Sequence, residues 1–140
     1  MLQITKGNIS CLQDVRVFYA KCNYDGGVKS EDCLFLAKID HKLVGVVRLC
    51  PEANVLVLRG MQVLPKFQGQ GIGTKLLKSC NNYLGQQSCY CIPWRHLRSF
   101  YEQIGFEEIL PTKLPIVLSR RLERYIAKNM NVIPMYKPDS

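Results

Sequence analysis

The chain of 140 residues has no long uninterrupted apolar segment. No run approaches the ~18 residues that a membrane-spanning helix needs. Met1 is followed by LQITKGN rather than by basic residues and the apolar core of a secretory signal. Internal repeats, low-complexity tracts and linkers are also lacking, which excludes a repeat architecture. These absences predict one soluble domain over residues 1–140, located in the cytoplasm and without a membrane partner.

The cysteines follow no disulfide pattern. There are seven, an odd number, and most lie within apolar runs, such as Cys33 in DCLFLAKI and Cys50 in VVRLC. This placement indicates reduced, buried thiols of a cytosolic protein. Cys89 and Cys91 lie two residues apart on one face of a predicted strand, but a metal site needs more ligands than these and the nearby His96. We therefore expect no metal.

Dense runs of basic residues are also absent, although the formal net charge is +8. A basic excess of this size can serve solubility alone, or it can attract an anionic ligand through the field of the whole protein. A cofactor with a pyrophosphate and a further phosphate would be such a ligand. Because the lysines and arginines are spread along the chain, we expect no nucleic-acid partner.

The apolar positions predict helices and strands in alternation. Helical spacing or strand-like apolar runs give a helix over 12–22, strands at 33–39, 43–50 and 55–64, a helix over 72–84, a strand at 89–92, a helix near 97–104, a strand at 106–110, a helix over 115–127 and an edge strand at 132–136. Short connections between the first three strands indicate an antiparallel meander. The predicted fold class is α/β (α+β): a mixed, mostly antiparallel central sheet with helices on both faces.

A glycine-rich segment joins the third predicted strand to the helix that follows it. It reads VLPKFQGQGIGT over residues 63–74. Its glycines let the backbone come close to a ligand and adopt positive φ. The free N–H groups of the next helix, together with its dipole, then favour a pyrophosphate. The spacing differs from the G-x-G-x-x-G of dinucleotide-binding folds and lacks the Gly-Lys-Ser/Thr ending of a P-loop.

Two motifs resemble those of the GNAT (Gcn5-related) N-acetyltransferase superfamily. The segment QGQGIG, residues 68–73, matches the signature Q/R-x-x-G-x-G/A, and FYEQIGF, residues 100–106, resembles the family's F-Y-x-x-x-G-F motif. The preceding MQVLP, residues 61–65, resembles the usual lead-in, and the order of elements also matches. The resemblance covers most of the chain and implies a GNAT-type fold that uses acetyl-coenzyme A as co-substrate.

The resemblance also implies which residues bind acetyl-CoA. Backbone groups of Met61 and Val63, on either side of Gln62, would hold the pantetheine arm and the acetyl carbonyl. The pyrophosphate would bind to the N–H groups of Gln68, Gly69, Gln70, Gly71, Ile72, Gly73 and Thr74. Gly60 interrupts the apolar strand before them, and a bulge there would help to part the central strands and leave a slot for the cofactor arm.

The superfamily's usual reaction is direct attack of an amine on the thioester, which needs a base and an acid. Tyr101 matches the tyrosine that often protonates the departing thiolate, and a core packing position is its alternative explanation. Many relatives carry a glutamate on the strand before the glycine loop, but residues 55–63 contain no acid. Histidine is a residue type that can act as a base near neutral pH, which makes His96 a candidate, although a solvated residue at a helix start is the favoured explanation. Glu52 is a more remote candidate, and a chain of waters could also carry the proton.

Two arginines in predicted strands bear on the acceptor. Arg59 is a charge in an otherwise apolar strand, where it either binds an acceptor carboxylate or forms an ion pair with Asp40, Glu52 or a C-terminal acid. Arg48, on the neighbouring strand, could join it. Trp94 stands where many relatives have an asparagine that contacts the cofactor, so it either lines the acceptor pocket or packs.

The predicted function is therefore an acetyl-CoA-dependent N-acetyltransferase that acts on a primary amine, with a small, carboxylate-bearing molecule weakly favoured as acceptor. Direct attack in a ternary complex is the implied mechanism. The alternative is an acetyl-CoA-binding regulator with little turnover, motivated by the missing glutamate. A homodimer is compatible with the resemblance, because dimers are frequent in this superfamily.

Overall fold

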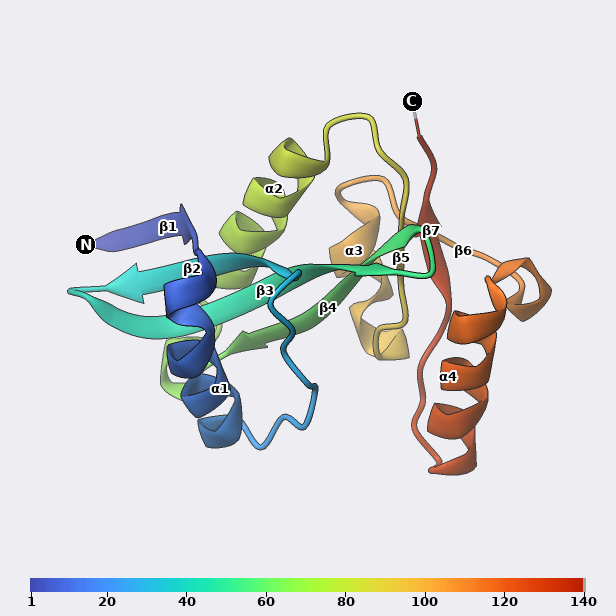
Figure 1. Ribbon diagram of the computed structural model, residues 1–140, viewed down its shortest axis with the longest axis horizontal. Coiled ribbons are helices and arrows are strands. Elements are labelled where there is room, and N and C mark those ends of the chain that lie inside the picture. Colours follow the sequence, from blue (N-terminus) through green and yellow to red (C-terminus); the bar gives the residue numbers. More distant parts are fainter. Residues whose placement is uncertain (140) are drawn as a thin grey trace. The chain divides into compact units, whose positions relative to one another are not determined.

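A computed structural model describes residues 1–139 and groups the chain into two compact units (Figure 1). The first unit comprises residues 1–51 and 58–85, and the second comprises residues 52–57 and the chain from residue 86 onward. Strand β4 (Val55–Val63) contributes residues to both units. The described part of the chain has seven strands and four α-helices, and most strand pairs are antiparallel. This confirms the predicted fold class, whereas the single domain over 1–140 stays a prediction.

The first unit contains the strands at the N-terminal side of the sheet, in the order β1-β2-β3-β4. Its elements are β1 (Leu2–Lys6), the 3-10 turn η1 (Ile9–Cys11), α1 (Leu12–Lys21), β2 (Cys33–Ile39), β3 (Lys42–Glu52), β4, the 3-10 turn η2 (Pro65–Phe67) and α2 (Ile72–Leu84). Strand β2 pairs antiparallel with both β1 and β3. The sequence did not predict β1. Asn8 accepts a hydrogen bond from the Ser10 amide at 3.0 Å and caps η1.

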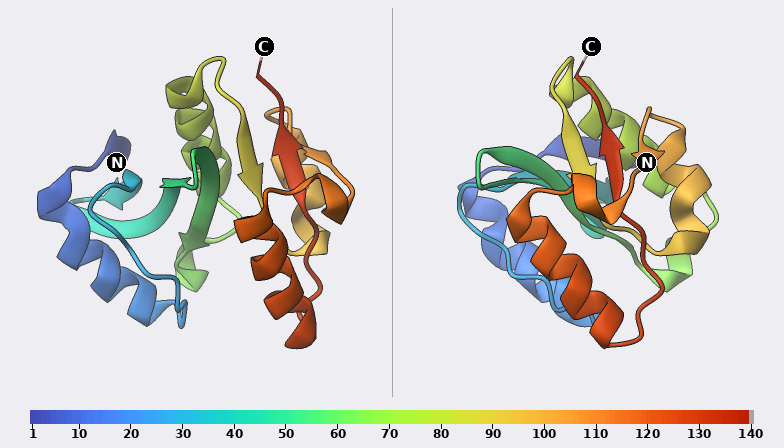
Figure 2. Two further views of the ribbon diagram at one scale, coloured as in Figure 1. Left: turned by 45° about the vertical axis from the view of Figure 1, so that its right-hand side comes forward. Right: turned by 90° about the vertical axis from the view of Figure 1, so that its right-hand side faces the viewer.

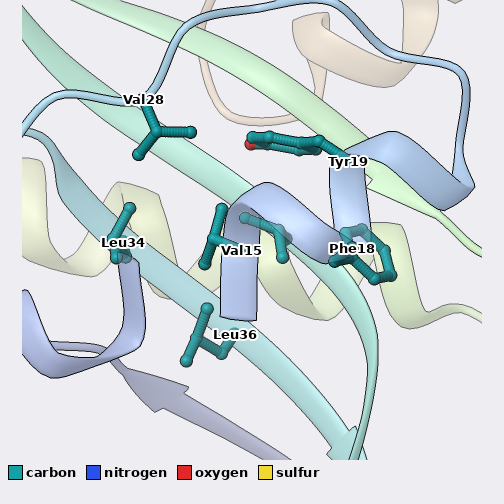
Figure 3. Packing of buried hydrophobic residues seen from close by; sticks show 7 residues of the cluster. Val15, Phe18, Tyr19, Val28, Leu34 and Leu36 are labelled. Atoms are coloured by element: carbon teal, nitrogen blue, oxygen red, sulfur yellow. The ribbon is translucent and has the colours of Figure 1, made fainter. Parts of the chain in front are cut away.

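Alternating side chains of β2 and β3 contact different helices. Leu34, Leu36 and Val46 pack against Val15, Phe18 and Tyr19 of α1 in one buried cluster (Figure 3). On the opposite face of β3, the Cα of Gly45 approaches α2 so closely that an added Cβ would lie 3.0 Å from Leu76. Helices α1 and α2 therefore cover opposite faces of these strands, and Ile72, Leu76, Leu77, Cys80 and Leu84 of α2 are buried as the helical spacing predicted.

The second unit continues from the first three residues of β4, in the strand order β4-β5-β7-β6. Its other elements are β5 (Cys89–Cys91), the 3-10 turn η3 (Arg95–Leu97), α3 (Arg98–Glu102), β6 (Glu107–Glu108), the 3-10 turn η4 (Pro111–Lys113), α4 (Ile116–Ala127) and β7 (Met135–Lys137). Val57 of β4 pairs parallel with Tyr90 of β5, while β7 is antiparallel to β5 and β6. Helix α4 lies along one side of these strands (Figure 2) and buries Leu118 and Leu122 against Val57.

The last strand begins later than the sequence predicted. The apolar run 132–136 indicated an edge strand, but β7 starts at Met135. Pro134 has no N–H group to donate, so regular pairing begins only after it. Before the proline, Val132 makes one isolated antiparallel bridge with Trp94.

Candidate functional site

The glycine segment leads into α2 without a side-chain cap. Gly69 and Gly71 have left-handed φ values of 79° and 81°, and Gly71 is the N-cap of α2. No side chain caps this helix start, and its first turn holds no acidic residue. Both glycines are exposed, and a Cβ added to either would meet no atom within 4 Å. The first N–H groups of α2 are therefore oriented toward a place that suits an anion.

The end of β4 leads into this loop. Met61, Gln62 and Val63 are half-buried, and the Gln68 side-chain amide donates to the carbonyl of Val63 at 3.0 Å. The Leu64 amide, one residue further, donates to the carbonyl of Val44 on β3 at 2.9 Å. These bonds fix the path of the chain between strand and loop, so the three strand residues and the glycines are neighbouring parts of one unit.

Tyr19 of α1 contacts β4 just before Met61. Its hydroxyl donates a hydrogen bond to the carbonyl of Gly60 at 2.9 Å. Gly60 has a φ of 68°, and a Cβ there would lie 2.3 Å from the Tyr19 hydroxyl oxygen. Only glycine therefore fits without displacing the tyrosine. The left-handed backbone at Gly60 agrees with the irregularity that the sequence indicated in this strand.

Among the described residues, Arg48 is the charged residue that is fully buried. Its Nη1 donates to the Asp32 carboxylate at 2.9 Å and to the carbonyl of Gly27 at 2.7 Å. Its Nε and Nη2 donate to the hydroxyls of Tyr19 at 3.2 Å and Tyr24 at 3.4 Å. Burial of an arginine requires such partners, because an unpaired buried charge is strongly destabilising.

A cavity of about 600 Å³ lies beside this network, between the end of α1 and the loop that follows it. Tyr19, Tyr24 and Asp25 are among its lining residues. The Arg16 guanidinium of α1 donates to the carbonyl of Val28 at 3.2 Å. Two arginines thus hold consecutive carbonyls of the loop that forms the cavity wall.

Arg59 is half-buried, in contrast to Arg48. Its charge lies close enough to Cys50 to lower the pKa of that thiol, although burial dominates and raises it overall. Asp40, which the sequence offered as a partner, is exposed and pairs with the amino terminus at 3.1 Å. Glu52 pairs with Arg121 of α4, and both side chains are largely buried.

Three further predicted residues belong to the second unit. Tyr101 of α3 is 4% exposed, and its ring packs edge-on against Phe100 and Phe106, with centroids 5.0 Å and 6.1 Å away. His96 lies exposed in η3. Trp94, at the start of η3, is 44% exposed. The structure thus divides the predicted residues, with both arginines and the glycine loop in the first unit and these three in the second.

Groups of three or more metal-ligating side chains do not occur within residues 1–139. In the same residues, no helix is both long enough and apolar enough to cross a membrane. The seven cysteines are all free.

Comparison with known proteins decides the family. The family described as the acetyltransferase (GNAT) domain matches residues 30–108, more than half of the 140 residues. The chain belongs to the GNAT acetyltransferase family. This GNAT chain is also 28% identical over 90 residues to an uncharacterized N-acetyltransferase, YhfO, of Bacillus subtilis, a match that covers 56% of the chain and 60% of that relative.

Solved structures share the fold at low sequence identity. A GNAT-family acetyltransferase from Streptococcus pneumoniae has a TM-score of 0.72 at 14% identity, with 100% of both chains covered. The N-acetylglutamate synthase of Neisseria gonorrhoeae, in complex with coenzyme A and N-acetyl-glutamate, has a TM-score of 0.72 at 14% identity. The match covers 100% of this chain and 35% of that enzyme. The PaiA N-acetyltransferase of Thermoplasma acidophilum, in complex with coenzyme A, has a TM-score of 0.62 at 16% identity, with 99% of each chain covered.

The sequence did not reveal the partners of Arg48. Asp32 precedes β2 directly and is 16 residues from Arg48, so its role depends on how the loop folds back. Tyr19 lies within the helix predicted over 12–22, and no local pattern marks it as a partner of Arg48. One signal was available: an arginine within the apolar run of β3 needs an acid nearby, and Asp32 adjoins the strand that pairs with β3.

Proposed function

We propose that this chain is an N-acetyltransferase that moves the acetyl group of acetyl-CoA to a primary amine of a small molecule. The observation that carries the proposal is the exposed start of α2, which follows two left-handed glycines and has neither a side-chain cap nor an acidic residue in its first turn. Such a helix start suits a pyrophosphate. The net charge of +8 supports attraction of a polyanionic co-substrate.

The co-substrate would lie along two neighbouring segments. The N–H groups of Gln68 through Thr74 would hold the pyrophosphate, as the match to the GNAT signature implies. Backbone groups of Met61 to Val63 would hold the pantetheine arm, and the half-burial of these residues leaves them partly accessible. Bound there, acetyl-CoA supplies an activated thioester carbon.

The proposed reaction is a direct transfer. The amine nitrogen attacks the thioester carbon, and the new C–N bond forms as the C–S bond breaks. The departing thiolate takes a proton from the phenol of Tyr101, which later regains one through water. The proton that the acceptor nitrogen loses goes to His96 or to water, and the exposure of His96 suits exchange with solvent.

The proposed acceptor carries a carboxylate, as an amino acid does. The gonococcal N-acetylglutamate synthase shares the fold and is known in complexes with N-acetyl-glutamate and with L-arginine. Half-buried Arg59 and exposed Trp94 are the proposed acceptor contacts, with Arg59 as the carboxylate partner. For Arg48, burial and the contacts with Asp32 and Gly27 favour an indirect part in the same task.

The proposal places the protein in the cytoplasm, where a reducing environment suits seven free cysteines. A homodimer is part of the proposal, and light scattering coupled to gel filtration tests it directly.

Two measurements test the activity. Calorimetric titration with coenzyme A and acetyl-CoA measures binding, and thiol release from acetyl-CoA measures turnover with amino acids, polyamines, aminoglycosides and a lysine peptide. Reactions without acceptor correct for the protein's own seven thiols. We expect binding of both ligands and turnover with amino acids.

The outcomes separate the two candidate functions. Turnover with one class of amine establishes the enzyme and names its acceptor. Binding without turnover favours the regulator, which the lack of an acidic residue in β4 also supports. Absence of any binding at millimolar acetyl-CoA contradicts both.

A further inference from the structure

Arg48 contacts three points of the segment 19–32, which lie 16 to 29 residues before it in the chain. Through Tyr19 it contacts α1, through Gly27 it contacts the loop after α1, and through Asp32 it contacts the residue before β2. The Asp32 side chain is 3% exposed and the Arg48 side chain is fully buried. The pair is therefore screened from water, and its hydrogen bonds hold one defined geometry.

Tyr19 extends this network to β4. Its hydroxyl accepts from Arg48 Nε and donates to the carbonyl of Gly60. Burial raises the pKa of Tyr19, so the phenol keeps the proton that it donates. Met61, which follows Gly60, is the first proposed contact of the cofactor arm. The network thus connects the loop at one end to the strand that would carry the thioester at the other.

The loop between α1 and β2 depends on backbone contacts for its position. The carbonyl of Gly27 is held by Arg48 and that of Val28 by Arg16, while its own residues Tyr24 and Asp25 line the cavity of about 600 Å³. The Tyr24 ring packs edge-on against Tyr19, with centroids 4.7 Å apart. A shift of either tyrosine would therefore change the cavity.

We propose that Arg48 is a positioning residue, which through Asp32 and Tyr19 fixes the loop of residues 22–32, a wall of the cavity of about 600 Å³, relative to the left-handed Gly60, and so sets the affinity for an acceptor in that cavity without touching it. This inference rests on the proposed transferase activity. It assigns Arg48 a task different from that of Arg59, the proposed carboxylate partner. It also gives a function to a buried charge pair, since an apolar pair of similar volume could have filled the same space.

Two substitutions test the positioning role. Arg48→Lys keeps a charge beside Asp32 but loses the fork of donors to Tyr19 and Tyr24. Tyr19→Phe removes only the hydroxyl between Arg48 and Gly60. It is the second test of the network in case the Arg48→Lys protein does not fold. Tyr83→Phe is the matched control, because its hydroxyl lies 3.6 Å from Cys33 on the other face of β2.

Three readouts are taken on the full chain: hydrogen exchange of residues 22–32, steady-state kinetics with the best amine, and calorimetric binding of coenzyme A. In Arg48→Lys and Tyr19→Phe we expect exchange in the loop to accelerate at least tenfold and the acceptor KM to rise at least fivefold. We expect kcat and the coenzyme A Kd to stay within twofold, and Tyr83→Phe to match the parent in all readouts.

Different results would overturn the positioning role of Arg48 and the proposed transferase activity. Unchanged loop exchange, or an unchanged acceptor KM in a protein that turns over, overturns the positioning role alone. A large fall in kcat at constant KM also overturns it, because that result would place Arg48 in the chemical step. A parent protein that turns over no amine overturns the proposed function. It also overturns the effect of Arg48 on acceptor affinity, which rests on that function.

Discussion

The hydroxyl of Tyr19 lies 2.9 Å from the carbonyl oxygen of Gly60, 41 residues further along the chain. This bond occupies the space in which a side chain at position 60 would lie. Helix and strand therefore constrain one another at a single contact, and substitutions at the two positions should not have independent effects.

Gly60→Ala is expected to destabilise the protein by about 2–4 kcal/mol, from the left-handed φ and from displacement of the tyrosine hydroxyl. In a Tyr19→Phe background the same substitution should cost about 1 kcal/mol less, because the nearest atom is gone. Urea denaturation of the parent, both single variants and the double variant measures this coupling. Strictly additive free energies of unfolding would contradict the contact.

Gly71→Ala is expected to weaken coenzyme A binding at least tenfold. Gly85→Ala, at the other end of α2, is the control, since both glycines have a positive φ and open space around an added Cβ. Gly71→Ala should lose about 1–2 kcal/mol of stability from its left-handed backbone. Gly85→Ala should lose more, because its ψ of −118° lies outside the left-handed helical region that other residues can adopt. Calorimetric titration measures the binding, and equal affinities for the two variants would place the pyrophosphate elsewhere.

Tyr101→Phe is expected to lower kcat by about 10²-fold, the lower range of general acid catalysis. Coenzyme A affinity should stay within threefold, because the ring and its packing against Phe106 are retained. Tyr125→Phe, on α4, serves as the control. Full activity of the Tyr101 variant would leave packing as its role.

Asp32→Asn is expected to cost about 3–5 kcal/mol of stability, because it leaves the Arg48 guanidinium buried without its counter-charge. Asp40→Asn is the comparison, since its carboxylate pairs with the amino terminus where both groups are exposed. That loss should stay below about 1 kcal/mol. Similar melting temperatures for the two variants would argue against a desolvated pair at Arg48.

Stability is expected to fall as the pH rises above 9. Burial first, and the Asp32 carboxylate in addition, raise the pKa of Cys50 from 9.0 to about 12, although the charges of Arg48 and Arg59 oppose this. The unfolded chain therefore releases the thiol proton near pH 9 while the native state keeps it, so the free energy of unfolding declines from there toward pH 12. Denaturation at pH 8, 9 and 10 should show this decline, with a shallower slope in Cys50→Ala. Identical slopes would contradict the shift.

Local patterns were enough to predict most elements. The strand at 33–39 agrees with β2 at both ends, because its apolar run is bounded by Asp32 and Asp40. The helix over 72–84 agrees with α2, because glycines mark both of its ends. Strand β1 was missed because it is a short edge strand with no fully buried residue. Its position depends on pairing with β2 rather than on its own side chains.

Long-range pairs limited the prediction of the site. The glycine loop was recognised from neighbouring residues, whereas the contacts of Tyr19 with Gly60 and of Arg48 with Asp32 join distant segments. The sequence identified two arginines in strands but could not tell which would be buried. Burial of Arg48 depends on which face of the sheet α1 covers. Arg48 lies on the same face of β3 as Val46, and Val46 packs against α1.

The two arginines beside the cavity bind main-chain carbonyls of the loop, at Gly27 and Val28. The path of the loop is thus largely insensitive to the identity of Asp25, whose side chain is exposed at the cavity, whereas Asn23 has a left-handed φ of 54° that favours asparagine or glycine. Selection or design can therefore exchange Asp25 to alter the lining of the cavity while the backbone stays in place. In this part of the chain, the residues that can diversify are separate from those that must be retained.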